Sequence, residues 1–305
     1  MLSLVGMVVI VVLLLRAVPL DALGHDLSTA ELPLVALAFA VSLTHRHLMG
    51  ADKWRRTVSA LGMPLGFGHG LFVWLGSYPV RELLPLRSGD LAKAYYLWRR
   101  FDYPFDRVVS TLVFDRACNV LGIFTVLVIG LALSSTQVPL GLAPLPVLVA
   151  AGLVLLLVSA RARDLVLWPF GRLGRRAARV AEGLLAAWRE IPGRGKAHLT
   201  LYAVAYQLSK VLILYLLFGS VGVEVPPGAL VLLTGLAMLA TNTPVTISGI
   251  GTREASILIF FAPFGERSAL LAAAVLFTVC ELIVPMLVAL PFTWPFLARS
   301  RATPA

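Results

Sequence analysis

The sequence predicts an all-α integral membrane protein: a helical bundle of about six full spans plus two broken, re-entrant helical segments in an inverted arrangement. Hydrophobic residues make up 59% of the 305 residues, charged residues only 14%, and the mean hydropathy is +0.88. A soluble domain has about a quarter of its residues charged. Apolar runs of roughly 20 residues, the length that crosses a bilayer, recur along the chain. Two further apolar regions are interrupted by Gly and Pro.

The chain is expected to form one polytopic membrane domain over residues 1–305. Its full spans are expected near residues 1–20, 32–47, 107–133, 145–160, 199–218 and 269–292. No Lys or Arg precedes the first apolar run and no clear cleavage motif follows it, so we interpret it as a retained span. Cys118 and Cys280 each lie inside an apolar run and are interpreted as small buried residues.

Basic residues orient the bundle, because cytoplasmic loops are enriched in Lys and Arg. The connection at about 161–198 carries nine basic residues against three acids and is expected to be a cytoplasmic, amphipathic segment on the inner leaflet. The basic loop at 45–56 and the C-terminal tail are also expected inside. The loops at 134–144 and 219–228 carry one charge between them and are expected outside. The direction of the first span stays open, because Arg16 follows it and nothing basic precedes it.

This orientation leaves two segments that cannot be straight spans. Because 79–106 is basic and expected inside, the region 57–78 must enter and leave by the same face, so the first broken segment covers about 57–106. The same argument makes the second broken segment, about 229–264, return to the outside face. Irregular backbone at membrane depth occurs where protein or a wet cavity satisfies its polar groups, and paired broken segments mark a transporter's substrate site. Ordinary kinked spans are the alternative.

Ionisable residues within the apolar segments mark the candidate site, because each costs at least about 2.5–3.5 kcal/mol at the centre of a span. In the stretch 248–254, SGIGTRE, glycines allow a turn, Thr252 can cap the next helix, and the helix N-terminus attracts anions. Arg253 adds a forked donor suited to phosphate. The predicted substrate-binding residues are Arg87, Asp90, Arg116, Asn119, Ser248, Gly249, Gly251, Thr252, Arg253 and Glu254. Asp115, Lys210 and Glu281 are predicted as coupling or supporting charges.

Each of these charges also has a structural interpretation, in which opposite charges neutralise one another. The candidate pairs are Asp115 with Arg116, Arg253 with Glu254, and Glu281 with Lys210 or Arg253. The arginines after the first hairpin are interpreted as interface charges that extend to lipid headgroups: Arg81, Arg99 and Arg100. The sequence shows no metal-ligand spacing and no nucleotide-binding motif, so we expect no metal and no cofactor. The net charge of +10 lies in short segments between apolar runs, so nucleic acid is not an expected partner.

Three short stretches, in this order, resemble the lysylphosphatidylglycerol-synthase transmembrane, or flippase-like, family. Residues 84–90, LPLRSGD, resemble its Pro-x-Arg-x-Gly-acid stretch, and Phe114, Asp115 and Arg116 with Asn119 resemble its acid–Arg helix motif. Residues 248–255, SGIGTREA, resemble its Gly-x-Gly-x-Arg-Glu-Ala signature. The resemblance implies a lipid-translocating membrane domain. The chain departs from the family's bifunctional members by ending at residue 305 without a soluble aminoacyl-transferase domain, so synthesis of the lysyl lipid is not expected and the substrate stays open.

We therefore expect translocation of an anionic phospholipid, or of a polyprenyl-phosphate or glycolipid precursor, across the cytoplasmic (inner) membrane of a bacterium or archaeon. The C-terminus is expected in the cytoplasm, the partner is a membrane lipid with a phosphate headgroup, and no enzymatic activity is expected. Two alternatives remain. One is an integral-membrane transferase acting on a lipid phosphate, with Asp115, Glu254 or Glu281 as a base. The other is a non-transporting partner subunit of a glycosyltransferase. Self-association also stays open.

Overall fold

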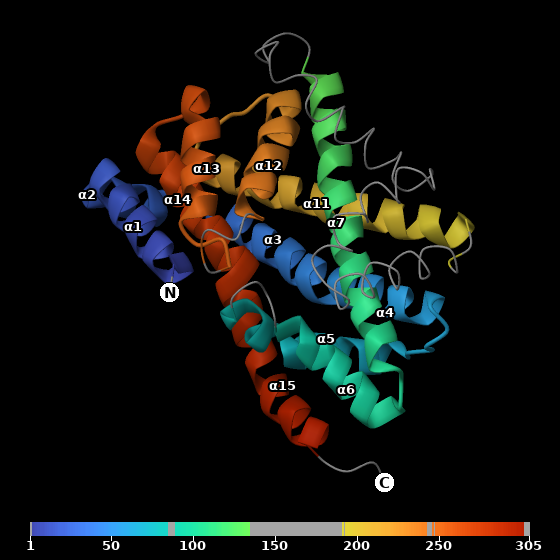
Figure 1. The fold of residues 1–305 in the computed structure, drawn as a ribbon. Helices are drawn as coiled ribbons and strands as arrows, with labels where there is room; N and C mark the ends of the chain where they lie inside the picture. The colour runs from blue at the N-terminus through green and yellow to red at the C-terminus, as the bar shows by residue number, and fades with distance from the viewer. Residues whose placement is uncertain are drawn as a thin grey trace.

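A computed structural model describes residues 2–84, 89–134, 191, 193–242, 246 and 248–301, and all regular secondary structure in these ranges is helical (Figure 1). Within these ranges, four helical stretches are long and apolar enough to cross a membrane: Leu32–Ala60, Phe105–Leu133, Gly193–Ser220 and Arg267–Ser300. The predicted all-α, multi-pass membrane architecture is confirmed. The number of spans stays a prediction, because the expected span at 145–160 and most of the connection at 161–198 lie outside the described residues.

The helices within the described ranges are named in the order of the chain. In order they are α1 (Leu2–Ala17), α2 (Leu20–Thr29), α3 (Leu32–Leu43), the π-helix η1 (Thr44–Met49), α4 (Gly50–Ala60), α5 (Phe67–Leu83), α6 (Leu91–Phe101), α7 (Phe105–Leu133), α11 (Gly193–Ser220), α12 (Pro227–Thr241), α13 (Thr252–Phe260), the 3₁₀-helix η3 (Ala262–Phe264), α14 (Arg267–Thr278), the π-helix η4 (Val279–Ile283) and α15 (Val284–Arg301). Pro19 separates α1 from α2, where its missing N–H does not interrupt a helix.

The expectation that residues 45–56 form a loop is wrong, whereas the side of the membrane on which they lie stays a prediction. The stretch Leu32–Ala60 is continuously helical through α3, η1 and α4, and the side chains of Arg46 and Lys53 are buried. The positive-inside rule counts these basic residues as a loop signal. In the folded chain they instead pair with carboxylates on other helices, so they remain inside the bundle.

Both regions expected to be broken are broken. In the first, α4 ends at Ala60 and α5 begins at Phe67. In the second, α12 ends at Thr241 and α13 begins only at Thr252. The re-entrant, inverted arrangement of these segments relative to a bilayer stays a prediction.

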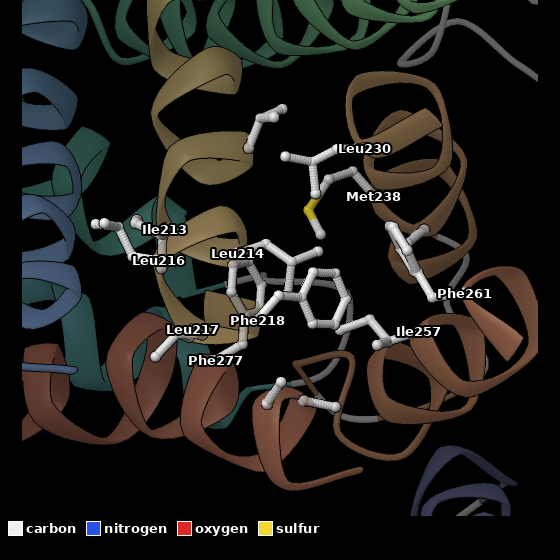
Figure 2. Packing of buried hydrophobic residues seen from close by; sticks show 14 of the residues in the cluster. Ile213, Leu214, Leu216, Leu217, Phe218, Leu230, Met238, Ile257, Phe261 and Phe277 are labelled. Atoms are coloured by element: carbon white, nitrogen blue, oxygen red, sulfur yellow. The ribbon is translucent and has the colours of Figure 1, made fainter. Parts of the chain in front are cut away.

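Two large hydrophobic clusters, with a small third one between α5 and α15, pack the described helices together. The larger one surrounds α11 and joins it to α12, α13 and α14, with the rings of Phe218 and Phe261 only 4.8 Å apart (Figure 2). The second cluster joins α4, α5, α6, α7 and α15 around Trp54 and Trp74. Long helix α7, which runs from top to bottom in Figure 1, contributes to both clusters. The two clusters thus fix the second broken segment and the first on a common helix.

Glycines let α7 approach its neighbours closely, as is usual between membrane helices. A Cβ added at Gly130 would lie 2.5 Å from the backbone nitrogen of Leu232 in α12. A Cβ added at Gly122 would lie 2.7 Å from the backbone oxygen of Ala203 in α11. Neither neighbour can rotate away, because both contact atoms belong to the backbone.

We expect Gly130→Ala to lower the melting temperature of the purified protein, because overpacking of a close contact costs about 1–3 kcal/mol. Gly24→Ala is the matched control. Gly24 is also helical, but nothing lies within 4 Å of its Cβ position. Because Ala favours a helix over Gly by about 0.5–1 kcal/mol, the control should melt at an unchanged or higher temperature. Equal melting of the two variants in detergent would show that α7 and α12 are not in direct contact.

Candidate functional site

A polar cavity of about 80 Å³ lies within the bundle, which is room for several water molecules. Hydrophobic residues of both clusters line part of it, among them Trp74, Ile123 and Phe277. Six of its lining residues are cationic and three carry carboxylates: Arg46, Arg81, Lys93, Arg116, Lys210 and Arg253 against Asp90, Asp115 and Glu281. The cavity therefore lies inside the bundle and is lined by more cations than carboxylates, which favours an anionic ligand.

The structure brings predicted site residues from distant parts of the sequence to this one cavity. Those that line it are Asp90, Asp115, Arg116, Asn119, Lys210, Arg253 and Glu281. Ser248, Gly249, Gly251, Thr252 and Glu254 form the turn that leads into α13 beside Arg253. Arg87 lies outside the described residues.

The turn before α13 is built from residues with positive φ. Ser248, Gly249 and Gly251 have φ of 52°, 78° and 87°. Glycine adopts this region readily, whereas Ser248 is held there at a cost of order 1 kcal/mol, a strain that tends to occur at functional sites. Glu254 Oε2 accepts a hydrogen bond of 2.6 Å from the N–H of Gly251. The chain's own carboxylate thus takes one of the N–H groups predicted to face an anion.

Thr252 does not cap α13 as predicted. The helix begins at Thr252 with Gly251 as its N-cap residue, and the Thr252 hydroxyl donates to the Gly249 carbonyl at 3.1 Å. Because Glu254 reaches back to the Gly251 N–H, it provides the capping interaction instead.

Arg253 is 4% exposed and contacts neutral oxygens in the described part of the chain. Its Nη1 donates to the Thr278 hydroxyl and its Nη2 to the Ser248 carbonyl, each at 3.1 Å. The Thr278 hydroxyl in turn donates to Glu254 Oε1. Arg253 and Glu254 therefore do not form the predicted neutralising pair, but share Thr278 between them. The guanidinium lies at the cavity wall, with its Cζ 5.8 Å from the centroid of the Phe277 ring.

Asp115 and Arg116 also have separate partners, so the interpretation of these two as one neutral pair is wrong. Adjacent residues of a helix point about 100° apart, and the two side chains reach different neighbours. Arg116 donates to Asp90, which also pairs with Lys93 at 2.8 Å. Burial alone would raise the pKa of Asp90, but the charges of Lys93, Arg116 and Arg81 hold that pKa well below its ordinary range.

On the Asp115 side, the partner is a lysine of α4. Lys53 Nζ lies 2.9 Å from Asp115 Oδ1 and donates to Asn119 Oδ1 at 2.5 Å. Asn119, one turn along α7 from Asp115, donates to its Oδ2 at 3.3 Å. Gln207 of α11 donates to the Asn119 carbonyl at 3.2 Å. Helices α4, α7 and α11 are therefore joined by one polar network at the cavity.

The two broken segments meet beside the cavity. The Ser248 hydroxyl, before α13, donates at 2.5 Å to the carbonyl of Glu82, near the end of α5. Arg81 and Asp90 from the first segment and Thr241 and Arg253 from the second line the same space. Over residues 1–289 the sequence matches the family described as lysylphosphatidylglycerol synthase TM region.

The chain belongs to this family. The match spans both broken segments and every residue that lines the cavity, so the resemblance of the three short motifs is confirmed. Among curated proteins, none matches the chain.

In this chain, Glu281 has direct contacts with residues that were not predicted as its partners. Its Oε2 lies 3.3 Å from Arg46 Nε and 3.6 Å from His45 Nε2, and its Oε1 accepts from the Ser42 hydroxyl at 3.1 Å. Arg46 is thus a direct partner that was not among the predicted ones, while Lys210 lines the same cavity and its charge also acts on Glu281. The sequence assigned Arg46 to a loop, which removed it from the candidate partners.

Two π-helices, η1 and η4, create this contact. A π turn shifts the hydrogen-bond register of a helix and is frequent at functional sites. Arg46 Nε donates at 2.8 Å to the backbone carbonyl of Glu281, and the Tyr78 hydroxyl donates to the same carbonyl at 3.2 Å. The Ser42 hydroxyl donates to the Cys280 carbonyl at 2.6 Å. Side chains from α3, η1 and α5 thus donate hydrogen bonds to two backbone carbonyls of η4, those of Cys280 and Glu281.

Sequence reasoning missed Arg46, Lys53 and Gln207 and misplaced Arg81. Arg81 is 4% exposed and donates to Glu82 Oε1 from Nε and Nη2, at 3.1 and 2.9 Å, so it does not extend to lipid headgroups as expected. For Arg46 and Lys53, the sequence does contain a helical-spacing signal. Arg46 and Lys53 are seven positions apart, which places them on one face of the continuous helix Leu32–Ala60.

Proposed function

We propose that the protein moves a lipid with an anionic phosphate headgroup across the cytoplasmic membrane, and that the headgroup passes through the polar cavity. The observation that supports this most directly is the excess of cations over carboxylates in a cavity within a membrane bundle. Charges at membrane depth are costly, so a retained excess of one sign indicates a ligand of the opposite sign. Membership of a membrane-domain family with a phospholipid in its name agrees with this ligand class.

Arg253 is the proposed phosphate ligand. Its guanidinium lines the cavity and contacts neutral oxygens, so its charge is available to a headgroup. Arg116 is the second ligand, because its side chain is 37% exposed while Asp90 holds one of its nitrogens. Two guanidinium groups offer the forked hydrogen bonds that phosphate accepts, and the acyl chains would stay in the lipid.

The broken segments provide the mobile part in this proposal. In transporters with discontinuous helices, the substrate site lies where two such segments meet, and the site opens alternately to the two faces. The contact between Ser248 and the Glu82 carbonyl lies at such a meeting point. We propose that the two segments are inverted relative to each other, that the C-terminus is cytoplasmic, and that the lipid crosses without covalent change.

Reconstitution into liposomes tests the proposal. Fluorescently labelled phosphatidylglycerol that starts in the inner leaflet should become accessible to a membrane-impermeant quencher. This should happen faster than in liposomes without protein, and faster than for labelled phosphatidylcholine in liposomes with protein. Mass spectrometry of the recovered lipid checks for covalent change. Modified lipid would favour a transferase, and neither exchange nor modification would favour a partner subunit; both outcomes reject transport.

A further inference from the structure

Every carboxylate that lines the cavity already has a cationic partner within the chain. These pairs are Asp90 with Lys93 and Arg116, Glu281 with Arg46, and Asp115 with Lys53. A headgroup that carries an ammonium group would therefore meet carboxylates whose charge is already compensated. It would also meet the remaining positive excess of the lining.

Lys53 occupies the place that such an ammonium group would need. Its side chain is 2% exposed, and Nζ lies 2.9 Å from Asp115 Oδ1, 2.5 Å from Asn119 Oδ1 and 5.0 Å from the centroid of the Tyr206 ring. A carboxylate, an amide oxygen and an aromatic face are the groups that bind an ammonium ion in proteins. Asp115, Asn119 and Tyr206 all line the cavity, so a lipid ammonium would compete for the same three groups.

We propose that Lys53 excludes lipids with an ammonium headgroup, so that the substrate is a phosphate lipid whose headgroup carries hydroxyl groups and no cation. This inference rests on the proposed function and narrows its substrate class. It separates the substrate of this chain from the lysyl lipid after which the family is named, because the ammonium groups of that lipid would face like charges inside a buried site.

Gln207 supports the hydroxyl part of the proposal. Its side chain is 3% exposed and lines the cavity, and its Nε2 donates to the Asn119 carbonyl. Its Oε1 is buried and has no hydrogen-bond partner within the described part of the chain. A buried acceptor without a donor is costly, and the hydroxyl of a glycerol or sugar headgroup would satisfy it.

The test compares wild type, Lys53→Gln and Lys53→Gln/Asp115→Asn in two measurements. The first is the rise in melting temperature that added phosphatidylglycerol or lysylphosphatidylglycerol causes in detergent, which reports binding to the folded state. The second is exchange of the same two lipids across liposomes.

Wild type should prefer phosphatidylglycerol by at least about tenfold in affinity. Lys53→Gln opens Asp115 to the lipid ammonium and should remove or reverse that preference. The double variant lacks both charges and should discriminate against the lysyl lipid again.

Equal affinity of the wild type for the two lipids would overturn the proposal, and so would an unchanged preference in folded Lys53→Gln. If Lys53→Gln does not fold, the proposal is tested by the lipid preference of the wild type and by that of the charge-balanced double variant. Preferential binding of phosphatidylglycerol without any exchange would support the exclusion by Lys53 while rejecting transport. If the wild type exchanges the lysyl lipid as fast as phosphatidylglycerol, transport is supported and the exclusion by Lys53 is rejected.

Discussion

Arg253→Ala should reduce exchange of phosphatidylglycerol in liposomes to the rate of empty vesicles, and Arg253→Lys should already slow it by about tenfold or more. A hydrogen bond to a charged group contributes about 1.5–3 kcal/mol, and every 1.4 kcal/mol is a factor of ten. Lys replaces the fork with a single point charge and loses the second bond to phosphate. It also loses the paired contacts to Thr278 and Ser248 that orient the guanidinium.

The folded state should tolerate these substitutions, because removing one cation reduces the positive excess of the cavity. Arg267→Ala is the matched control: the same change at an exposed arginine that does not line the cavity. It should transport like wild type. Full exchange by a correctly inserted Arg253→Ala protein would exclude this residue as the phosphate ligand, whatever the other arginines do.

Glu281→Gln is expected to cause the largest loss of stability. Removing one partner of a buried ion pair costs roughly 3–5 kcal/mol, because the other charge is left buried and unpaired. Here the remaining charge is Arg46, which is 6% exposed and would lose its closest carboxylate among the described residues, while it keeps its bond to the Glu281 carbonyl and its contact with the Tyr78 ring. The melting temperature in detergent should therefore fall well below that of Glu224→Gln, the same change at an exposed site.

The double variant Arg46→Met/Glu281→Gln separates a structural pair from a coupling site. If the pair is structural, removing both charges should recover much of the lost melting temperature, because no unpaired charge remains. If Glu281 instead binds a coupling proton, Glu281→Gln should retain lipid binding and wild-type melting but lose the pH dependence of exchange. The three direct contacts to Glu281 favour the structural pair. Unchanged melting and unchanged exchange in Glu281→Gln would contradict both roles.

Much of the architecture was predictable because the bilayer acts on each segment separately. A span must be apolar over its length and satisfy its own backbone hydrogen bonds, and a cluster of Gly and Pro residues within an apolar run favours an interruption. The breaks between α4 and α5 and between α12 and α13 follow from such local signals. The short stretches around Asp90, Asp115 and Arg253 were recognisable for the same reason, since each motif is contiguous in sequence.

The partners of the charged residues were not predictable in this way. Arg46, Lys53 and Arg81 have the same side chains as residues that extend to headgroups or lie in cytoplasmic loops. What distinguishes them is a carboxylate within about 4 Å, supplied by Glu281 and Asp115 from other helices and by the neighbouring Glu82. Counting basic residues along the chain therefore predicted that 45–56 is a loop beyond the end of a span. Because of this error, Arg46 and Lys53 were not considered for the candidate site.

The membrane environment, the helical class, the two interruptions and the family could all be inferred from the sequence, because hydropathy, Gly/Pro clusters and motifs are properties of contiguous residues. Which charges compensate one another, and which remain for a ligand, became clear from the three-dimensional arrangement of the helices. That choice depends on side-chain distances across α4, α7, α11, α13 and η4, where a buried ion is stable only next to its counter-ion. For this reason Lys53, which no motif marks, lies at the point where the headgroup would be selected.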